Sequence, residues 1–290
     1  MIVVLGGTGL IGGYVAEELS AVEATFRMVL RQPEKAAGIP LGGSVCRGDL
    51  DDPASLATAF DGGTRLFLLS PHGPDMAAQQ LAAIDAAKQA GISHIVKISG
   101  SPQAVGPDCL ASTGRQHYVV EQALKASGIG HTILRPSFFM QNLLGKPASF
   151  VREGKPVMLP FDAQQKFTFV DVRDIAKTAA KALVEPRGFN QTLQLVGSRL
   201  SFCEVAIVLS KFLGHPVGYR KIPQWLASMV LRLQREPVWL RRHQLEMAKV
   251  FAAQGHMPAS RDLARFLGDT PISLNRFVAD HLDAFVQPEA

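Results

Sequence analysis

Three glycines near the start of the chain have a spacing that suits the binding of phosphate groups. Gly6, Gly9 and Gly12 form the pattern G-x-x-G-x-x-G directly after the apolar residues 2–5, and a helical pattern of apolar residues follows. In a strand–turn–helix unit, the first glycine lets the chain turn, the second lets backbone N–H groups approach a pyrophosphate, and the third lets helix and strand pack closely. The pattern predicts a dinucleotide-binding loop. The residues expected to contact the dinucleotide are Gly6, Thr8, Gly9, Leu10, Ile11 and Gly12.

The residues after the second expected strand indicate which dinucleotide the loop binds. Proteins that bind the 2′-hydroxyl of NAD usually place Asp or Glu about 20 residues beyond the glycines. This chain has Arg31 there, and Lys35 follows shortly after. A guanidinium suits the 2′-phosphate of NADP by its charge and by its forked hydrogen bonds. The sequence therefore predicts NADP in preference to NAD, with Arg31 and Lys35 at the phosphate. The alternative is that Arg31 is a solvated loop residue.

Residues at the ends of the next expected strands complete the predicted dinucleotide site. Asp49 and Leu50 follow the third strand, where the carboxylate or the Leu50 backbone can meet the adenine edge. Asp49 can equally cap the following turn. The residues expected to flank the ribose and nicotinamide follow the fourth and fifth strands: Ser70, Pro71 and Ser99. Alternatively, the Ser99 hydroxyl only closes its strand with a hydrogen bond.

The helix expected over residues 115–127 carries the candidate catalytic residue, His117. Tyr118 is the only tyrosine in this helix and Gln122 stands four residues after it, so the Tyr-x-x-x-Lys pair of ordinary short-chain dehydrogenases is absent. This argues against an alcohol dehydrogenase or a sugar-nucleotide epimerase, which need a strong acid/base at the carbinol. His117 is expected to donate a proton or to touch the nicotinamide ribose. The alternative is a structural histidine bonded to the backbone.

An apolar and aromatic segment follows the sixth expected strand, at the edge of the sheet where ligands bind in such folds. The expected acceptor pocket is built from Phe138, Phe139, Met140 and Asn142. Alternatively, two of the three apolar residues only seal the core between two lobes. His72 is a second candidate proton donor beside this pocket, or else a surface loop residue, because Gly73 and Pro74 follow it.

Alternating strand and helix patterns must position these residues. The expected strands cover residues 2–5, 25–30, 44–47, 65–69, 94–99 and 131–135, the last ended by Pro136, and helices are expected at 53–60, 76–90 and 115–127. Strands that alternate with helices of this length predict an α/β fold with a Rossmann-type, doubly wound parallel sheet. Loops and short elements are expected over 145–167, a helix over 170–184 and a last strand over 192–196.

The chain is expected to divide into two parts. Residues 1–140 and 166–197 are predicted to form the NADP-binding domain, and residues 141–165 and 198–290 a smaller, mostly helical lobe that covers the substrate. A helical apolar stripe in the lobe is expected to pack on the core, the alternative being a mobile lid. The stripe consists of Trp225, Leu226, Met229, Val230 and Leu233.

Composition limits the remaining classes of function. The chain has 290 residues, a net charge of +5 and 47% hydrophobic residues, values typical of a folded protein with an ample core. Nucleic-acid binding is not expected, because the basic residues gather only at 240–243, which we interpret as a solvated helix face. Cys46, Cys109 and Cys203 are far apart and odd in number, so neither a disulfide framework nor a metal site is expected. We expect no membrane association, a cytoplasmic location, and a monomer or homodimer.

Several of these motifs also occur together, in this order, in one known family. They are Gly6–Gly12, Arg31, Ser127–Ile129, Thr132–Pro136, Asn142 and Phe169–Ala176. The chain resembles the NmrA-like atypical short-chain dehydrogenases/reductases, and it is similar to their type 2 NADPH:quinone oxidoreductases and triphenylmethane-dye reductases. His117 and Glu121 match the His-x-x-Thr-Glu segment of these reductases, with Val120 in place of the threonine.

The resemblance implies an activity and leaves one alternative open. It implies an NADPH-dependent oxidoreductase that delivers a hydride to a small conjugated electrophile, a quinone-like or dye-like acceptor. Such acceptors are already electrophilic, so orientation of donor and acceptor can replace the missing Tyr-x-x-x-Lys pair. The same family also contains proteins that bind NADP without evident chemistry. A redox sensor that acts through a protein partner is therefore the alternative.

Overall fold

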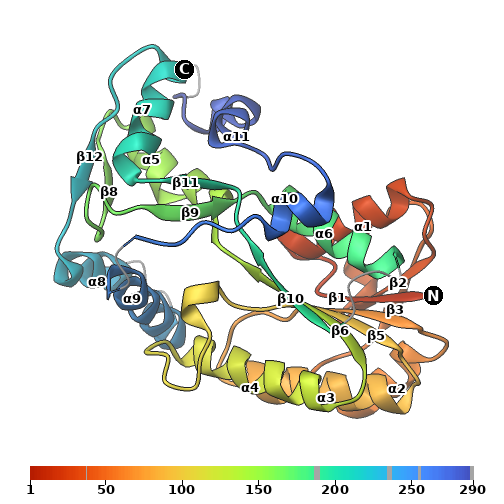
Figure 1. The fold of residues 1–290 in the computed structure, drawn as a ribbon. Helices are drawn as coiled ribbons and strands as arrows, with labels where there is room; N and C mark the ends of the chain where they lie inside the picture. The colour runs from red at the N-terminus through yellow and green to blue at the C-terminus, as the bar shows by residue number, and fades with distance from the viewer. Residues whose placement is uncertain (37, 186–189, 234–236, 254–255, 288–290) are drawn as a thin grey trace.

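Strand β1 (Ile2–Leu5), the apolar run before the glycines, lies inside a seven-stranded parallel sheet with the order β10-β6-β5-β4-β1-β2-β3 (Figure 1). The computed structural model describes the chain except residues 37, 186–189, 234–236, 254–255 and 288–290, and it does not describe the side chains of residues 35, 231 and 233. The predicted doubly wound Rossmann-type sheet is confirmed. Its other strands are β2 (Phe26–Leu30), β3 (Gly43–Arg47), β4 (Arg65–Leu68), β5 (His94–Ile98), β6 (Gly130–Pro136) and β10 (Gln191–Leu195).

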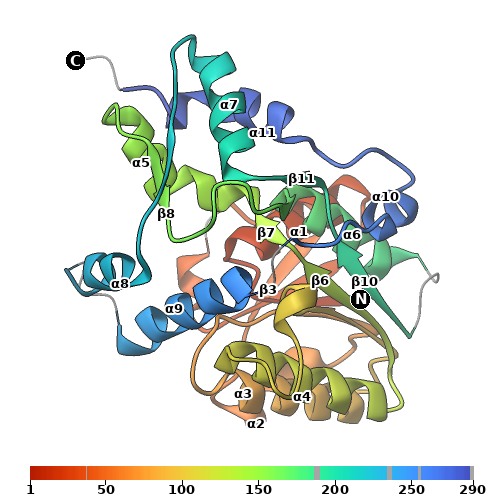
Figure 2. The ribbon, with the colours of Figure 1, turned by 60° about the vertical axis from the view of Figure 1, so that its left-hand side comes forward.

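Helices cover both faces of this sheet, which is why the central strand β1 is apolar and buried along its whole length (Figures 1 and 2). Helices α1 (Leu10–Ala21) and α6 (Val172–Val184) pack against one another on one face. Neighbouring residues of β1 point to opposite faces: Val4 joins the core under α1 and α6, and Val3 joins the other core. That second face is covered by α2 (Pro53–Phe60), α3 (Met76–Gln89) and α4 (Ser112–Ala126).

A third core lies outside the main sheet and is rich in phenylalanine. It is centred on Phe167, Phe169 and Phe202, all fully buried. Two small sheets contribute to it: β7 (Phe138–Phe139), β9 (Phe167–Val170) and β11 (Ser198–Leu200) form one, and β8 (Val157–Leu159) and β12 (Tyr219–Lys221) form the other. The helices of this region are α5 (Lys146–Arg152), α7 (Phe202–Leu213), α8 (Gln224–Leu233), α9 (Val238–Ala253) and α11 (Leu274–Asp280). Helix α10 (Asp262–Leu267) instead packs on α6 and β10 of the main sheet.

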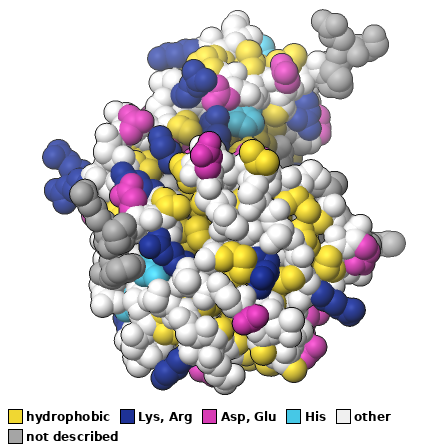
Figure 3. All heavy atoms as spheres, turned by 90° about the vertical axis from the view of Figure 1, so that its right-hand side faces the viewer, with side chains coloured by type: hydrophobic (Ala, Val, Ile, Leu, Met, Phe, Trp, Pro, Cys, Tyr) yellow, Lys and Arg dark blue, Asp and Glu magenta, His cyan; other side chains and the backbone are white. Residues whose placement is uncertain are grey.

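Short 3₁₀ helices connect several of these elements. They are η1 (Pro33–Lys35), η2 (Pro102–Ala104), η3 (Met140–Leu144) and η4 (Leu282–Ala284). Helix α9 contacts both η2 and α4, so it lies beside the segment that follows β5 (Figure 2). None of the helices in the described part of the chain is long and apolar enough to cross a membrane. On the face drawn in Figure 3, basic and acidic side chains are interspersed.

The structure corrects three predictions about these elements. The helix predicted from residue 170 begins at Val172, because Asp171 accepts a hydrogen bond from the Arg173 backbone N–H and residue 170 ends β9. The strand predicted over 192–196 is not the last one, since the short strands β11 and β12 follow. Most of the apolar stripe predicted on α8 does not pack on the core: Trp225 is 67% exposed and Met229 46% exposed, while Leu226 is half-buried. The side chain of Leu233, the last member of the stripe, lies outside the described part of the structure.

Asp174 ties the end of the chain to helix α6 at a cost in electrostatic free energy. Its Oδ2 accepts a hydrogen bond from the Ile272 backbone N–H at 2.8 Å. Burial raises the pKa of Asp174 from its usual 3.8 to about 6, although that hydrogen bond opposes the shift and the nearby Asp171 adds to it. A pKa that is higher in the folded than in the unfolded state means that folding is disfavoured wherever the carboxyl is ionised. Stability from this group is therefore lost as the pH rises through about 6.

Replacing Asp174 by asparagine should remove this cost and keep an oxygen acceptor for Ile272. We expect Asp174→Asn to be more stable than the wild type at pH 7.5, by about 1–2 kcal/mol, and the difference to vanish towards pH 4. Urea denaturation at both pH values measures it. A stability difference that does not change with pH would contradict the assignment.

Candidate active site

The glycine turn at the start of α1 has the geometry that the sequence pattern requires. Gly6 has a φ of +71°, a conformation that favours glycine, and it accepts a hydrogen bond from the Gly9 N–H. A Cβ added to Gly12 would lie 2.1 Å from the Gly6 carbonyl oxygen, so the helix packs directly on the turn. Gly9 occupies the N-cap position, and no side chain caps the helix. The first turn of α1 therefore keeps backbone N–H groups available for an anion. Thr8 and Leu10 are exposed beside it.

A single methyl group at Gly12 should disrupt this turn. We expect Gly12→Ala to cost about 1–3 kcal/mol of stability and to lower the affinity for NADPH at least tenfold, because the clash is with backbone atoms that cannot rotate away. The adjacent Gly13→Ala is a matched control. The nearest atom to its added Cβ, the Gly7 carbonyl oxygen, is 3.9 Å away. Calorimetric titration with NADPH and thermal denaturation of both variants check the prediction. Equal behaviour of the two variants would exclude a special role for Gly12.

Arg31 stands at the end of β2, level with the glycine turn. Leu5 is paired with Val29, so the residues that follow each strand leave the sheet side by side. Arg31 is exposed, and its guanidinium makes no hydrogen bond or ion pair with any residue that the structure describes. The side chain of Lys35 lies outside the described part of the structure. Arg31 is thus available to a ligand at the turn.

The next predicted contacts lie at the same edge of the sheet, and the polar side chains among them, Asp49 and Ser70, already have protein partners. The Asp49 carboxylate accepts a hydrogen bond from the Asp51 N–H at 3.1 Å. It therefore stabilises the turn after β3, which was the second of the two roles predicted for Asp49. Leu50 beside it is half-buried. Ser70 is buried and its hydroxyl accepts a hydrogen bond from Gln80 Nε2 at 2.8 Å, whereas Pro71 is exposed.

Ser99 belongs to a buried ion-pair network at the end of β5. Its hydroxyl donates a hydrogen bond of 2.6 Å to Glu121 Oε1. Arg135 binds both carboxylate oxygens of Glu121, at 2.9 and 2.6 Å. Glu121 is fully buried, and burial by itself raises its pKa, but the hydrogen bonds from Arg135 and Ser99 outweigh this and hold the pKa below its usual value. Ser99 and Glu121 therefore fasten β5 and β6 to helix α4.

Lys97 lies fully buried in the middle of this region, on β5. Its ammonium group donates hydrogen bonds to Gln80 Oε1 at 2.8 Å and to the Ile98 carbonyl oxygen at 3.1 Å. The third neighbour is His117 Nδ1 at 3.2 Å. Burial lowers the pKa of Lys97 to about 7, although the Glu121 carboxylate opposes the shift. Lys97 is therefore a buried amine that exchanges its proton near neutral pH.

His117, the predicted catalytic residue, connects Lys97 with two further histidines. Its Nε2 is 3.4 Å from the Nε2 of His72, and the His72 ring meets the ring of His243 edge-on with centroids 4.9 Å apart. His243 Nδ1 is 3.1 Å from the Thr113 hydroxyl. Burial, with Lys97 as the next contribution, lowers the pKa of His117 well below its ordinary value, so the ring is neutral at pH 7. The basic segment 240–243 is thus not wholly a solvated face, because His243 points inward.

The expected acceptor pocket is divided between interior and surface. Met140 is fully buried, and Phe138 lies among the phenylalanines of the third core, 5.5 Å from Phe169 between ring centroids. Phe139 is half-buried and packs against the core under α1, while Asn142 is exposed. Met140 and Phe138 therefore fit the alternative prediction, in which two of the apolar residues only seal the core. The role of these four residues at a substrate stays a prediction.

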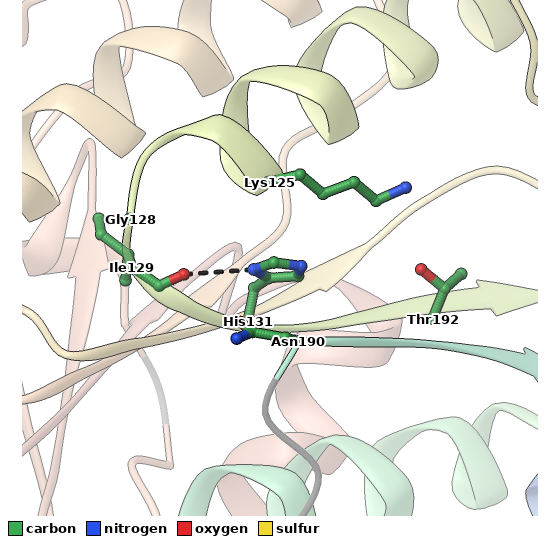
Figure 4. Close-up of a pocket in the computed structure, with 6 residues that line it drawn as sticks. All are labelled: Lys125, Gly128, Ile129, His131, Asn190 and Thr192. Atoms are coloured by element: carbon green, nitrogen blue, oxygen red, sulfur yellow. Dashed lines mark hydrogen bonds between the residues drawn. The ribbon is translucent and has the colours of Figure 1, made fainter.

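A separate hollow of about 360 Å³ lies at the opposite edge of the main sheet (Figure 4). It is lined by Lys125, Gly128, Ile129, His131, Asn190 and Thr192, which stand where β6 and β10 begin. In Figure 4 the His131 ring points to the Ile129 carbonyl oxygen, 3.2 Å from Nδ1. Ligands of doubly wound sheets bind at the carboxyl ends of the strands, so this hollow is distinct from the candidate active site.

Sequence reasoning missed four residues of the site: Lys97, Gln80, Arg135 and His243. A lysine inside an otherwise apolar strand was a signal for the first, because a strand covered on both faces buries every side chain. The other three are brought in by elements far away in the sequence. Among the described residues, no group of three or more His, Cys, Asp and Glu side chains has an arrangement that could hold a metal ion.

Comparison with known proteins identifies the family. The model of the NmrA-like family matches residues 1–278. The chain belongs to the NmrA-like family. This NmrA-like protein is 37% identical over 221 residues to the NAD(P)H azoreductase of Xenophilus azovorans, a match that covers 76% of each chain.

Two solved structures resemble this NmrA-like protein along nearly its whole length. The NADPH-dependent quinone oxidoreductase QOR2 of Escherichia coli, complexed with NADPH, has a TM-score of 0.86 at 25% identity and covers 97% of this chain and 100% of its own. The triphenylmethane reductase of Citrobacter sp., complexed with NADP(H), has a TM-score of 0.85 at 23% identity and covers 96% and 99%. At that identity the second likeness shows the fold alone.

Proposed function

We propose that this NmrA-like protein is an NADPH-dependent reductase that delivers a hydride to a small conjugated acceptor of the quinone, azo or dye type. The observation that carries the proposal is the uncapped glycine turn beside Arg31, which has no partner among the described residues, in a chain 37% identical to an NAD(P)H azoreductase. The solved quinone oxidoreductase that it resembles binds NADPH.

The residues present fit the dinucleotide. Gly12 leaves no room for a Cβ where the helix meets the turn, and the exposed N–H groups at the start of α1 suit a pyrophosphate. Arg31 would hold the 2′-phosphate, and Asp49 and Leu50 would border the adenine. When bound, NADPH supplies the hydride. Ser70, Pro71 and Ser99 would border the ribose and nicotinamide, since β4 and β5 end there.

The remaining predicted roles are part of the same proposal. Residues 1–140 and 166–197 would hold the coenzyme, and residues 141–165 and 198–290 would cover the acceptor, with Asn142 as a polar contact. His117 would serve the transfer of protons rather than of hydride, because the Lys97 and His72 nitrogens lie beside its two ring nitrogens. The unpaired Cys46, Cys109 and Cys203 support a reducing cytoplasmic setting.

An absorbance assay tests the proposed function. The purified protein is mixed with NADPH and with a benzoquinone, an azo dye or a cationic triphenylmethane dye, and the loss of NADPH absorbance is followed. We expect at least one acceptor to be reduced at a rate proportional to the protein concentration, with NADPH preferred to NADH. A protein that binds NADPH tightly and leaves it unoxidised with every acceptor would instead be the redox sensor.

A further inference from the structure

We propose that His72 gives the proton that accompanies the hydride to the acceptor, and that His117 and the buried Lys97 resupply it through a hydrogen-bonded chain. This relay rests on the proposed reductase function. Two-electron reduction of a quinone needs one hydride and one proton, and the hydride donor supplies only the former. A side chain of this protein must therefore deliver the proton wherever water is excluded.

The position of His72 suits a direct donor better than that of His117. The His117 side chain is buried, and both of its ring nitrogens already face other nitrogens. His72 is exposed on the loop after β4, at the edge of the sheet that binds ligands. Its Nδ1 makes no hydrogen bond within the part of the chain that the structure describes. Gln116 holds this loop against α4 through the Gly73 carbonyl oxygen and the Ala77 N–H.

The contacts of Lys97 give the chain a direction. A protonated amine has three donors and no acceptor, so all three of its neighbours accept: Gln80 Oε1, the Ile98 carbonyl oxygen and His117 Nδ1. A neutral His117 that accepts at Nδ1 carries its proton on Nε2, where it can only donate to His72 Nε2. His72 then carries its proton on Nδ1, the nitrogen that makes no hydrogen bond among the described residues.

The transfer balances in protons and electrons. The hydride brings two electrons and one hydrogen to one carbonyl oxygen of the quinone, and His72 Nδ1 gives a proton to the other. His72 takes a proton at Nε2 from His117, and His117 takes one at Nδ1 from Lys97, which becomes a neutral amine. After the hydroquinone leaves, a proton from water enters at His72 and the same steps run in reverse.

The charged surroundings set the pH at which Lys97 holds its proton. Helix α4 contributes Glu121 and His117, β6 contributes Arg135, the loop after β4 contributes His72, and α9 contributes His243. Of these, the Glu121 carboxylate favours the charged amine, while burial disfavours it more strongly. Lys97 loses its proton as the pH rises through about 7, so the proton supply should fall above that pH.

The test compares two acceptors that differ in their need for a proton. A cationic triphenylmethane dye takes a hydride at its central carbon and becomes neutral without any proton, whereas a benzoquinone needs one. We expect His72→Asn and Lys97→Met to lower quinone turnover at least tenfold and to leave dye turnover within about twofold. The fall of quinone turnover above pH 7 should disappear in Lys97→Met. His131→Asn, at the opposite edge of the sheet, is the control for loss of a histidine.

Each other outcome decides against a specific step. An equal loss of turnover with the quinone and the dye, or an unchanged quinone turnover in His72→Asn, would overturn the relay. Because His72 is exposed, the His72→Asn variant should fold even if Lys97→Met does not. If the wild type reduces the quinone but not the dye, added imidazole decides: recovery of His72→Ala supports the relay, and no recovery overturns it. If the wild type leaves NADPH unoxidised with every acceptor tested, the proposed function itself is wrong, and the relay falls with it.

Discussion

Arg31→Asp is expected to weaken the binding of NADPH by roughly 100-fold or more and to change the binding of NADH by less than about threefold. The substitution removes a charge-assisted pair worth about 1.5–3 kcal/mol and adds repulsion between two negative groups, and every 1.4 kcal/mol is a tenfold change in affinity. NADH has no 2′-phosphate, so its binding neither loses the charge-assisted pair nor suffers the new repulsion. Arg31 has no partner among the described residues, so the protein itself should lose little stability.

Calorimetric titration of wild type and variant with both coenzymes measures this effect. Lys88→Asp, an exposed lysine at the end of α3, makes the same change in net charge far from the turn and should leave both affinities unchanged. If Arg31→Asp weakens the binding of NADPH and NADH equally, Arg31 does not contact the 2′-phosphate. Equal weakening of NADPH in both variants would show that only the overall charge matters.

Glu121→Ala is expected to lose about 3 kcal/mol of stability, the low end of the range for breaking a buried ion pair. The Glu121 side chain is fully buried, while the Arg135 side chain is 20% exposed and keeps some access to water. Removal of the carboxylate leaves the Arg135 guanidinium and the Ser99 hydroxyl without their acceptor. It also removes the negative charge that favours the protonated form of Lys97, so the pKa of Lys97 should fall further.

Urea denaturation of three variants separates the ion pair from general effects of truncation. Glu153→Ala, the same substitution at an exposed pair with Lys155, should leave stability unchanged within error. The double variant with Arg135→Met should recover part of the loss, because it no longer buries an unpaired charge. A loss in Glu121→Ala no larger than that in Glu153→Ala would contradict the structural role of the pair.

The local patterns of this sequence were sufficient for the sheet and for the glycine turn. The glycine spacing at 6, 9 and 12 and the apolar strand before it depend only on residues close together in the chain, where backbone geometry and side-chain size decide the outcome. The ends of the parallel strands share one edge whatever the loops do, so Arg31, Ser70 and Ser99 could be placed there in advance.

Helix boundaries and the outer helices were less predictable. Helix α6 begins after Asp171 because the Asp171 side chain accepts a hydrogen bond from the Arg173 N–H. The apolar pattern runs from the preceding strand into the helix, so the pattern by itself did not show this boundary. Trp225 follows a helical apolar pattern, yet it is 67% exposed. A periodic pattern predicts a helix, but it does not say which element covers the helix.

Only the tertiary structure brought the proton-transfer residues together. Lys97, His117 and His243 come from β5, α4 and α9, and their contacts cross long stretches of sequence that no local pattern specifies. Their chemistry depends on these contacts, because desolvation and neighbouring charges fix the pKa values and hydrogen-bond directions of buried groups. The sequence alone therefore determined where the glycine turn and the ends of the strands lie, and packing at a distance decided which titratable side chains meet beside them.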